Sequence, residues 1–252
     1  MRKTIIVANW KMNPGTSDEA QQLFETVGKG VNETHSVEVV ICPPFVFIPE
    51  IVRAASSVAF GVGGQDCFWE AQGAYTGEIS AAMLKNLGCS YVILGHSERK
   101  NYLGETYGMI NKKVKAVLQS GLIPVVCIGE KERQGQNGNK EELERQMREV
   151  LKEIPRELAK NLVLCYEPEW AISSNKGAAA AAPEDCAKAL ASMREVAKEM
   201  FGDFTVPILY GGSTNSANIK GFIESGAQGV LVGSSSLNAE EFARLVRNAA
   251  ME

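Results

Sequence analysis

The 252-residue sequence has few of the residues that build metal centres or disulfide frameworks. It contains only two histidines, His35 and His96, which lie far apart along the chain. None of its six cysteines forms a Cys-x-x-Cys pair, and three of them lie inside apolar runs, so we expect buried free thiols. Because zinc sites need several cysteine or histidine ligands at short spacing, the sequence predicts no metal centre.

Long apolar runs and clusters of like charge are also missing. No stretch reaches the ~18 apolar residues of a membrane-spanning helix, and the first apolar run, residues 5–8, is too short for a signal peptide. The formal net charge is −4, with lysines and arginines scattered along the chain. Surfaces that bind nucleic acid or anionic membranes need clustered cations. We therefore expect a cytoplasmic protein that binds neither nucleic acid nor membrane.

The sequence does contain eight short apolar runs of the kind that form buried strands. They cover residues 5–8, 37–42, 58–62, 91–94, 123–128, 162–165, 206–210 and 229–232. Continuous Val, Ile and Leu runs are typical of strands buried on both faces, as in parallel sheets. The runs therefore predict a parallel sheet rather than an antiparallel one.

Segments with helical spacing separate most of these runs, for example residues 18–27, 105–118, 140–154, 183–200 and 239–249. Ser17 and Pro183 are helix-start signals followed by acidic residues, which suit the helix dipole. Eight strand–helix units in ~250 residues match an α/β fold of the (β/α)8 barrel type. An open doubly wound sheet fits less well, because it usually has fewer strands. No composition break divides the chain, so we predict one barrel domain over residues 1–252.

Reactive groups in such a barrel gather at the carboxyl ends of the strands. An amine at Lys11, an imidazole at His96 and a carboxylate at Glu167 follow the first, fourth and sixth runs. Glycine-containing turns at residues 211–213 and 233–234 follow the seventh and eighth, where barrels often bind phosphate through backbone N–H groups. Singly, each group has an ordinary explanation as a solvated charge, an ion-paired acid or a turn glycine. Together they indicate one site.

The chemistry of these groups points to an isomerisation. Glu167 lies beside a loop able to exclude water, which suits a general base. His96 lies where a strand gives way to a helix, and the helix dipole favours a neutral ring that can donate a hydrogen bond. Lys11 can face an oxyanion or a phosphate. We predict proton abstraction beside a carbonyl in a small phosphorylated substrate, with an enediolate intermediate and no cofactor.

At these positions the chain closely resembles triosephosphate isomerases over essentially its full length. Seven matching stretches occur in the family's order: Asn9-Trp-Lys-Met-Asn13, Gly73-Ala-Tyr-Thr-Gly-Glu-Ile-Ser80, Gly95-His-Ser-Glu-Arg99, Cys127-Ile-Gly-Glu130, Tyr166-Glu-Pro-x-Trp-Ala-Ile172 (x being any residue), Tyr210-Gly-Gly-Ser213 and Leu231-Val-Gly233. The resemblance implies a TIM barrel that interconverts dihydroxyacetone phosphate and D-glyceraldehyde 3-phosphate in glycolysis and gluconeogenesis. It also implies that Glu167 is the base and His96 the electrophile.

The same resemblance assigns the residues that hold the substrate. It implies that Asn9 and Lys11 contact the substrate and that Glu98 supports the lysine. It implies that the phosphate is held by backbone N–H groups of Ser173, Ser213, Gly233 and Ser234. The loop Gly73–Ser80 resembles the protruding loop that family members insert into a second subunit, so a homodimer is implied.

The sequence departs from the family's usual pattern in a few places. The tip of the active-site loop that follows the base usually reads Gly-Thr-Gly and is Ser173-Ser174-Asn175 here, with Gly177 at the start of the second hinge. Pro168 and Trp170 would form a stiff first hinge. Gly233-Ser234 replaces paired glycines, and Arg99-Lys100 replaces Arg-Arg. Three alternatives stay open: an isomerase of longer ketose phosphates, a Schiff-base aldolase using Lys11, and a non-catalytic phosphate-sugar binder.

Overall fold

Eight parallel strands close into a barrel in chain order, each paired with the next and the last with the first. The computed structural model describes residues 3–31, 36–56, 58–133, 140–172, 181–203 and 205–250. The strands are β1 (Thr4–Asn9), β2 (Val37–Cys42), β3 (Gly61–Gly64), β4 (Tyr91–Leu94), β5 (Ile123–Ile128), β6 (Val163–Tyr166), β7 (Ile208–Tyr210) and β8 (Gly229–Val232). The predicted (β/α)8 barrel is confirmed.

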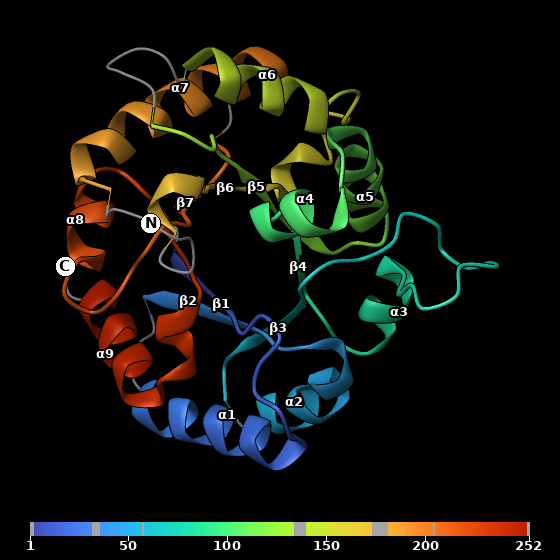
Figure 1. The fold of residues 1–252 in the computed structure, drawn as a ribbon, viewed down its shortest axis with the longest axis vertical. Helices are drawn as coiled ribbons and strands as arrows, with labels where there is room; N and C mark the ends of the chain where they lie inside the picture. The colour runs from blue at the N-terminus through green and yellow to red at the C-terminus, as the bar shows by residue number, and fades with distance from the viewer. Residues whose placement is uncertain are drawn as a thin grey trace.

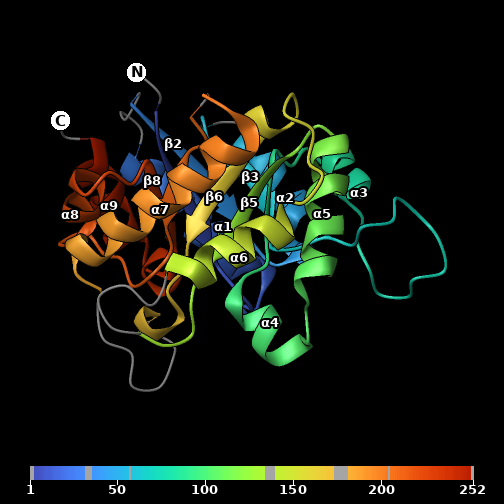
Figure 2. The same ribbon diagram turned by 90° about the horizontal axis from the view of Figure 1, so that it is seen from above.

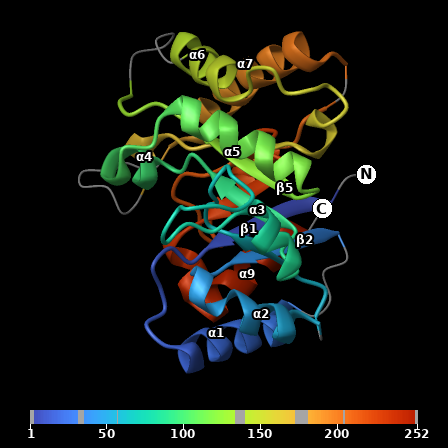
Figure 3. The same cartoon turned by 90° about the vertical axis from the view of Figure 1, so that its right-hand side faces the viewer.

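The helices form a ring around these strands (Figure 1). They are α1 (Ser17–Val31), α2 (Ile48–Ala55), α3 (Ala81–Asn86), α4 (Ser97–Leu103), α5 (Tyr107–Gln119), α6 (Lys140–Val150), α7 (Pro183–Phe201), α8 (Ile219–Glu224) and α9 (Ala239–Ala250). Short 3-10 turns are η1 (Phe45–Phe47), η2 (Ala159–Asn161), η3 (Glu169–Ala171) and η4 (Ser234–Leu237). Figure 3 shows α1 and α2 on one side of the barrel and α6 and α7 on the opposite side.

Alternation along each strand builds two apolar layers. On β1, Ile5 and Val7 belong to a buried cluster formed by strand side chains, whereas Ile6 and Ala8 belong to the larger cluster shared with the helices. Successive strand side chains point to opposite faces, so one set fills the barrel interior and the other packs under the helices. All six cysteines are buried and unpaired, as predicted.

The third strand differs from the prediction. It was expected at residues 58–62, but Val58 donates its N–H to the Ala55 carbonyl in a turn after α2, and the strand begins at Gly61. A Cβ on Gly63 would lie 2.8 Å from Cys42 Sγ and 2.9 Å from the Tyr91 carbonyl oxygen. Glycine at this position lets β3 lie close to its neighbours β2 and β4, and a strand built from glycines contains no continuous apolar run.

A long loop after β3 extends away from the barrel (Figure 2). Its root is closed by the N–H of Phe68, which donates to the Ile79 carbonyl, and by a bridge between Phe68 and Ser80. The Phe68 ring stacks on Trp69 and lies 4.6 Å from the Tyr75 ring. The loop is thus held in shape at its base by its own aromatic side chains.

Among the described helices, none has the length and apolar character needed to span a membrane.

Candidate active site

A pocket of about 390 Å³ lies at the carboxyl ends of the strands. It is lined by Asn9, Lys11, Asn13, His96, Ile172, Gly211, Gly212, Ser213, Thr214, Leu231, Gly233, Ser234 and Leu237. Every described residue expected to hold substrate, together with His96, therefore surrounds one cavity. The expected base, Glu167, does not line it.

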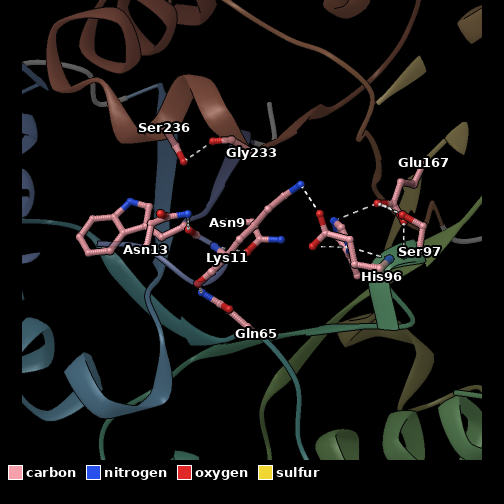
Figure 4. A network of polar contacts seen from close by, with 11 residues as sticks. Asn9, Lys11, Asn13, Gln65, His96, Ser97, Glu167, Gly233 and Ser236 are labelled. Atoms are coloured by element: carbon pink, nitrogen blue, oxygen red, sulfur yellow. Dashed lines mark hydrogen bonds and ion pairs between the residues drawn. The ribbon is translucent and has the colours of Figure 1, made fainter. Parts of the chain in front are cut away.

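Lys11 follows β1 in a strained backbone conformation. Its φ is 54°, in the left-handed region that a side chain other than glycine rarely occupies. The Lys11 N–H donates to Asn9 Oδ1 at 3.0 Å, and its carbonyl accepts from Gln65 Nε2 at 2.8 Å. Gln65 also donates to the Cys42 carbonyl, which ties this turn to β2. These contacts hold the lysine backbone in the conformation that directs its side chain across the pocket (Figure 4).

The Lys11 ammonium lies between a carboxylate and the turn after β8. Its Nζ is 2.5 Å from Glu98 Oε1 on α4. A Cβ placed on Gly233 would lie 3.3 Å from Lys11 Cε and 3.7 Å from Nζ, so the lysine side chain packs directly against this turn. The cation therefore stands next to the turn where phosphate binding was expected.

His96 caps the N-terminus of α4 with its side chain. Its Nδ1 accepts the Glu98 N–H at 3.3 Å, which leaves the proton of a neutral ring on Nε2. Nε2 lies 2.9 Å from Glu167 Oε1. Burial opposes a charge on the ring, but the adjacent Glu167 carboxylate outweighs it and raises the pKa of His96 above its ordinary value. The predicted neutral ring is thus favoured by the Nδ1 contact and by burial, and opposed by Glu167.

Glu167 is buried, with both carboxylate oxygens held. Ser97 donates its N–H to Oε2 at 2.9 Å and its hydroxyl to Oε1 at 3.0 Å. Burial works to raise the pKa of Glu167, but His96, the nearby Lys100 ammonium and the Ser97 N–H together hold it below its ordinary value. The acid is therefore ionised and withdrawn from the pocket, on the far side of His96.

The backbone of Glu167 is fixed to the end of the neighbouring strand. Its N–H donates to the Ile128 carbonyl at 2.8 Å. A Cβ on Gly129 would lie only 1.8 Å from the Glu167 carbonyl oxygen, so only glycine fits there. The next residues are held as well, because Glu130 Oε1 accepts from the Tyr166 hydroxyl at 2.9 Å and from Trp170 Nε1 at 2.8 Å.

The turns after β7 and β8 are joined to each other and to the segment after β6. Ser235 donates its hydroxyl to the Thr214 carbonyl at 2.8 Å. Ser213 donates both its N–H, at 2.9 Å, and its hydroxyl, at 2.8 Å, to the Ala171 carbonyl. The Ser213 N–H, a predicted phosphate donor, is thus occupied by a residue of η3.

Ser173 falls outside the described residues, as do the loop tip at Ser174 and Asn175 and the hinge position Gly177. Sequence reasoning did not assign roles to Ser97 and Gln65, which hold Glu167 and Lys11. Ser97 could have been suspected from its place beside His96 at a helix start, but Gln65 carried no local signal. In the described part of the chain, no three His, Cys, Asp or Glu side chains are grouped as metal ligands would be.

A closed parallel barrel with charged groups and glycine turns around one pocket at its carboxyl ends defines a (β/α)8-barrel enzyme of small phosphorylated substrates. The family model described as triosephosphate isomerase matches residues 4–249, and the chain belongs to that family. It therefore has triosephosphate isomerase activity, an aldose–ketose isomerisation of glycolysis.

The similar proteins agree over their whole length. The chain is 44% identical to a triosephosphate isomerase of Moorella thermoacetica, with 98% of each chain covered. It is 43% identical to one of Caldanaerobacter subterraneus subsp. tengcongensis, covering 98% of this chain and 99% of the relative. A crystal structure of triosephosphate isomerase from Bartonella henselae superposes with a TM-score of 0.86 at 31% identity, covering 98% of both chains. Similarity over the full length to these isomerases supports an enzyme, and not the non-catalytic phosphate-sugar binder considered above.

Proposed function

We propose that Glu167 is the base and His96 the electrophile of this isomerase, with Lys11 stabilising the charge that develops on the substrate. Glu167 would remove a proton from the carbon beside the substrate carbonyl and return it to the neighbouring carbon. His96 would donate a hydrogen bond from Nε2 to the oxygen that becomes negative as the enediolate forms, and it would pass a proton from the neighbouring hydroxyl to that oxygen before the carbon is reprotonated. The observation that carries this proposal is that His96 lines the pocket and contacts Glu167 through the same nitrogen.

The contact between Glu167 and His96 has to break before either group can act. While it persists, the Nε2 proton is directed at the carboxylate instead of the substrate, and the carboxylate cannot reach a substrate carbon. A shift of Glu167 away from Ser97 and into the pocket would free both groups together. Substrate binding would supply the free energy for this shift.

Phosphate binding would require a movement of the same segment. The Ser213 N–H now donates to the Ala171 carbonyl, four residues after Glu167. A displacement of residues 168–172 that releases this carbonyl from Ser213, with a rotation of the Glu167 side chain away from Ser97, would prepare both ends of the site. Asn9, Gly233 and Ser234 line the same pocket and complete the proposed substrate contacts. Ser173 stays a predicted donor.

The functional test is a coupled assay with D-glyceraldehyde 3-phosphate, followed by isomerisation in deuterium oxide. We expect turnover, with deuterium in the product at the carbon to which the base returns the proton, which is the former carbonyl carbon. Turnover no faster than the uncatalysed background would reject the proposal. Comparing kcat/KM for three-carbon and four-carbon ketose phosphates decides whether longer substrates are also used, which stays an open prediction.

The pairing of Lys11 with Glu98 bears on the aldolase alternative. A Schiff base requires a neutral amine, whereas a carboxylate 2.5 Å from Nζ stabilises the ammonium. The pairing therefore favours an electrostatic role for Lys11. Borohydride reduction in the presence of dihydroxyacetone phosphate should leave the mass of the protein unchanged. A trapped adduct on Lys11 would support the aldolase.

We also propose that the protein is a cytoplasmic homodimer, built from one barrel domain per subunit and assembled through the loop Gly73–Ser80. Among the described residues, the large apolar side chains most exposed to solvent come from the connections after the first four strands. They are Met12, Val46, Tyr75, Met83, Leu87, Tyr102 and Leu103. Exposed apolar side chains on the connections after four successive strands favour association with a second subunit.

The dimer is tested by analytical ultracentrifugation over a range of concentrations. Tyr75→Asp should shift the protein toward monomer, because it places a charge at the centre of the proposed contact. Ala191→Asp, at an exposed position of α7, is the matched control and should leave the sedimentation of the protein unchanged. A wild-type protein that sediments as a monomer at micromolar concentration would overturn the proposal.

A further inference from the structure

The segment after β6 presents two carboxylates to the same short helix. Glu167 accepts from Ser97 at the start of α4, and Glu169 accepts from Asn101 one turn later on that helix. The Asn101 Nδ2 atom lies 2.7 Å from Glu169 Oε2, and Lys100 Nζ lies 3.5 Å from Oε1. Glu169 thus extends the contact between this segment and α4 beyond the expected base.

Glu169 is an unusual residue to bury beside a hinge. Its side chain is only 6% exposed and that of Lys100 only 10%. Removing a carboxylate from water is unfavourable unless charged and hydrogen-bonding partners replace the water, as Lys100 and Asn101 do here. Breaking one side of such a buried contact is strongly unfavourable, so the contact resists separation of the segment from α4.

The backbone before Glu169 leaves little freedom for Glu167 to move alone. The Glu167 N–H is bonded to the Ile128 carbonyl, and its own carbonyl is packed against Gly129. Pro168 follows with φ near −65°, which its ring fixes. Any backbone movement that accompanies the entry of the Glu167 carboxylate into the pocket must therefore come from residues 168–172, where the Glu169 side chain is tied to α4.

We propose that Glu169 is a positioning residue, which with Lys100 and Asn101 holds the segment after β6 on α4 and so keeps Glu167 withdrawn from the pocket. Substrate binding breaks this contact when Glu167 advances. The inference rests on the proposed role of Glu167 as the base. It adds a second tether to the one that Ser97 provides.

Weakening the tether should make the advanced arrangement easier to reach. A ligand that binds the advanced arrangement best gains affinity as the competing withdrawn arrangement is destabilised. Phosphoglycolate is a suitable probe, since its carboxylate and phosphate imitate the charges of an enediolate phosphate. Glu169→Gln should lower its dissociation constant by roughly three- to tenfold. KM should fall as well, with no matching rise in kcat.

Lys100 requires a double-mutant cycle, because its ammonium also lies in the electrostatic field of Glu167 and of Glu142 on α6. Lys100→Met removes both the pair with Glu169 and the electrostatic effect of the ammonium on Glu167 and Glu142. This electrostatic effect is lost in either background, so it cancels in the cycle. We therefore expect Lys100→Met to change phosphoglycolate affinity less in the Glu169→Gln background than in the wild type.

The cycle is measured by calorimetric titration, with thermal unfolding of every variant as a check of the fold. Glu149→Gln, which removes the carboxylate of an exposed pair with Arg145 on α6, is the matched control and should leave affinity unchanged. Unchanged or weaker binding by Glu169→Gln, or additive effects in the cycle, would overturn the inference. Near-normal turnover by Glu167→Gln would instead reject the proposed base, so the two failures are distinguishable.

Discussion

Glu167 Oε1 lies 2.9 Å from His96 Nε2, and Ser97 holds the same carboxylate from the other side. The expected base and electrophile are thus bonded to each other, and only the imidazole faces the pocket. This arrangement lowers the pKa of the acid and raises that of the ring. The contact stabilises the protein in the absence of substrate, and it must break before either group can react.

Glu167→Gln should abolish most of the activity. The amide keeps the shape of the side chain but cannot accept the proton, so we expect kcat to fall by a factor on the order of 10²–10⁴ or more. Steady-state kinetics with D-glyceraldehyde 3-phosphate measures the loss, and circular dichroism checks the fold. A variant with near-normal kcat would exclude Glu167 as the base.

The same substitution should change the titration of His96. The Glu167 carboxylate raises the pKa of the ring, while burial opposes its charge. With the carboxylate removed, burial remains, so the pKa of His96 should drop. Nitrogen-15 NMR of the imidazole in both proteins provides the measurement. An equal or higher pKa in Glu167→Gln would show that this contact does not control the ring.

The pair also predicts how stability depends on pH. His96 has a raised folded-state pKa, so its contribution is complete below about 6.5 and is lost as the pH rises through the folded pKa. Glu167 has a lowered pKa, so its contribution is present above about 4.5 and is lost as the pH falls through the folded value. The pair should stabilise the protein most between these limits. In denaturant titrations, His96→Gln should therefore lower the free energy of unfolding more at pH 5.5 than at pH 9. Equal losses at the two pH values would contradict the stabilising role of the pair.

Lys11→Met should impair the chemistry without unfolding the protein. Lys11 is partly exposed and its ammonium supplies the positive charge of the pocket, so we expect kcat/KM to fall by about 10²–10³. Lys29→Met, an exposed lysine on α1, is the control that keeps the overall charge matched. Competition by inorganic phosphate should weaken in the first variant alone. Equal effects in the two variants would exclude a specific role for Lys11.

A buried charge network lies at the root of the long loop after β3. Asp66 accepts from Lys113 Nζ at 2.8 and 2.9 Å and pairs with Arg99 at 2.9 Å, while Lys113 also pairs with Glu105. Burial, aided by Glu105, outweighs the two cations and raises the pKa of Asp66 to about 6. Ionising this carboxylate is therefore less favourable in the folded protein than in the unfolded chain.

The sign of that shift predicts falling stability as the pH rises. A folded-state pKa above the ordinary 3.8 means that the folded protein holds the proton more tightly, so stability declines through this range. Between pH 5 and pH 8 the free energy of unfolding of the wild type should fall by about 1 to 1.5 kcal/mol more than that of Asp66→Asn. Urea unfolding at fixed protein concentration measures the difference. Asp203→Asn, at an exposed position, is the control, and parallel pH profiles for wild type and Asp66→Asn would refute the prediction.

Several features of the fold were predictable because they depend on local patterns. The runs at residues 37–42, 91–94, 123–128 and 229–232 coincide with β2, β4, β5 and β8, since buried parallel strands need continuous apolar side chains. The short helices α2, α3, α4 and α8 were not predicted. Six to eight residues are too few for a periodic apolar pattern, and such helices form through packing against the barrel.

For the site, the positions of the reactive groups were predictable, but the contacts that hold them were not. Lys11 and His96 were expected at strand ends and line one pocket, because parallel strands place their carboxyl ends on the same face of a barrel. The contacts of Glu167 with His96 and Ser97 and the support of Lys11 by Gln65 were not predicted. Each joins residues far apart in the chain, and no sequence spacing specifies such a contact.

The amino-acid sequence alone determined the architecture and the kinds of reactive group, since strand periodicity and turn chemistry act over a few residues. Only the tertiary structure decided that Glu167 rests against His96 and Ser97, that Ala171 occupies Ser213, and that Glu169 is tied to α4. These relations depend on how closely separate loops approach one another after the barrel closes. That closeness is set by packing, as the absence of room for a side chain at Gly129 illustrates.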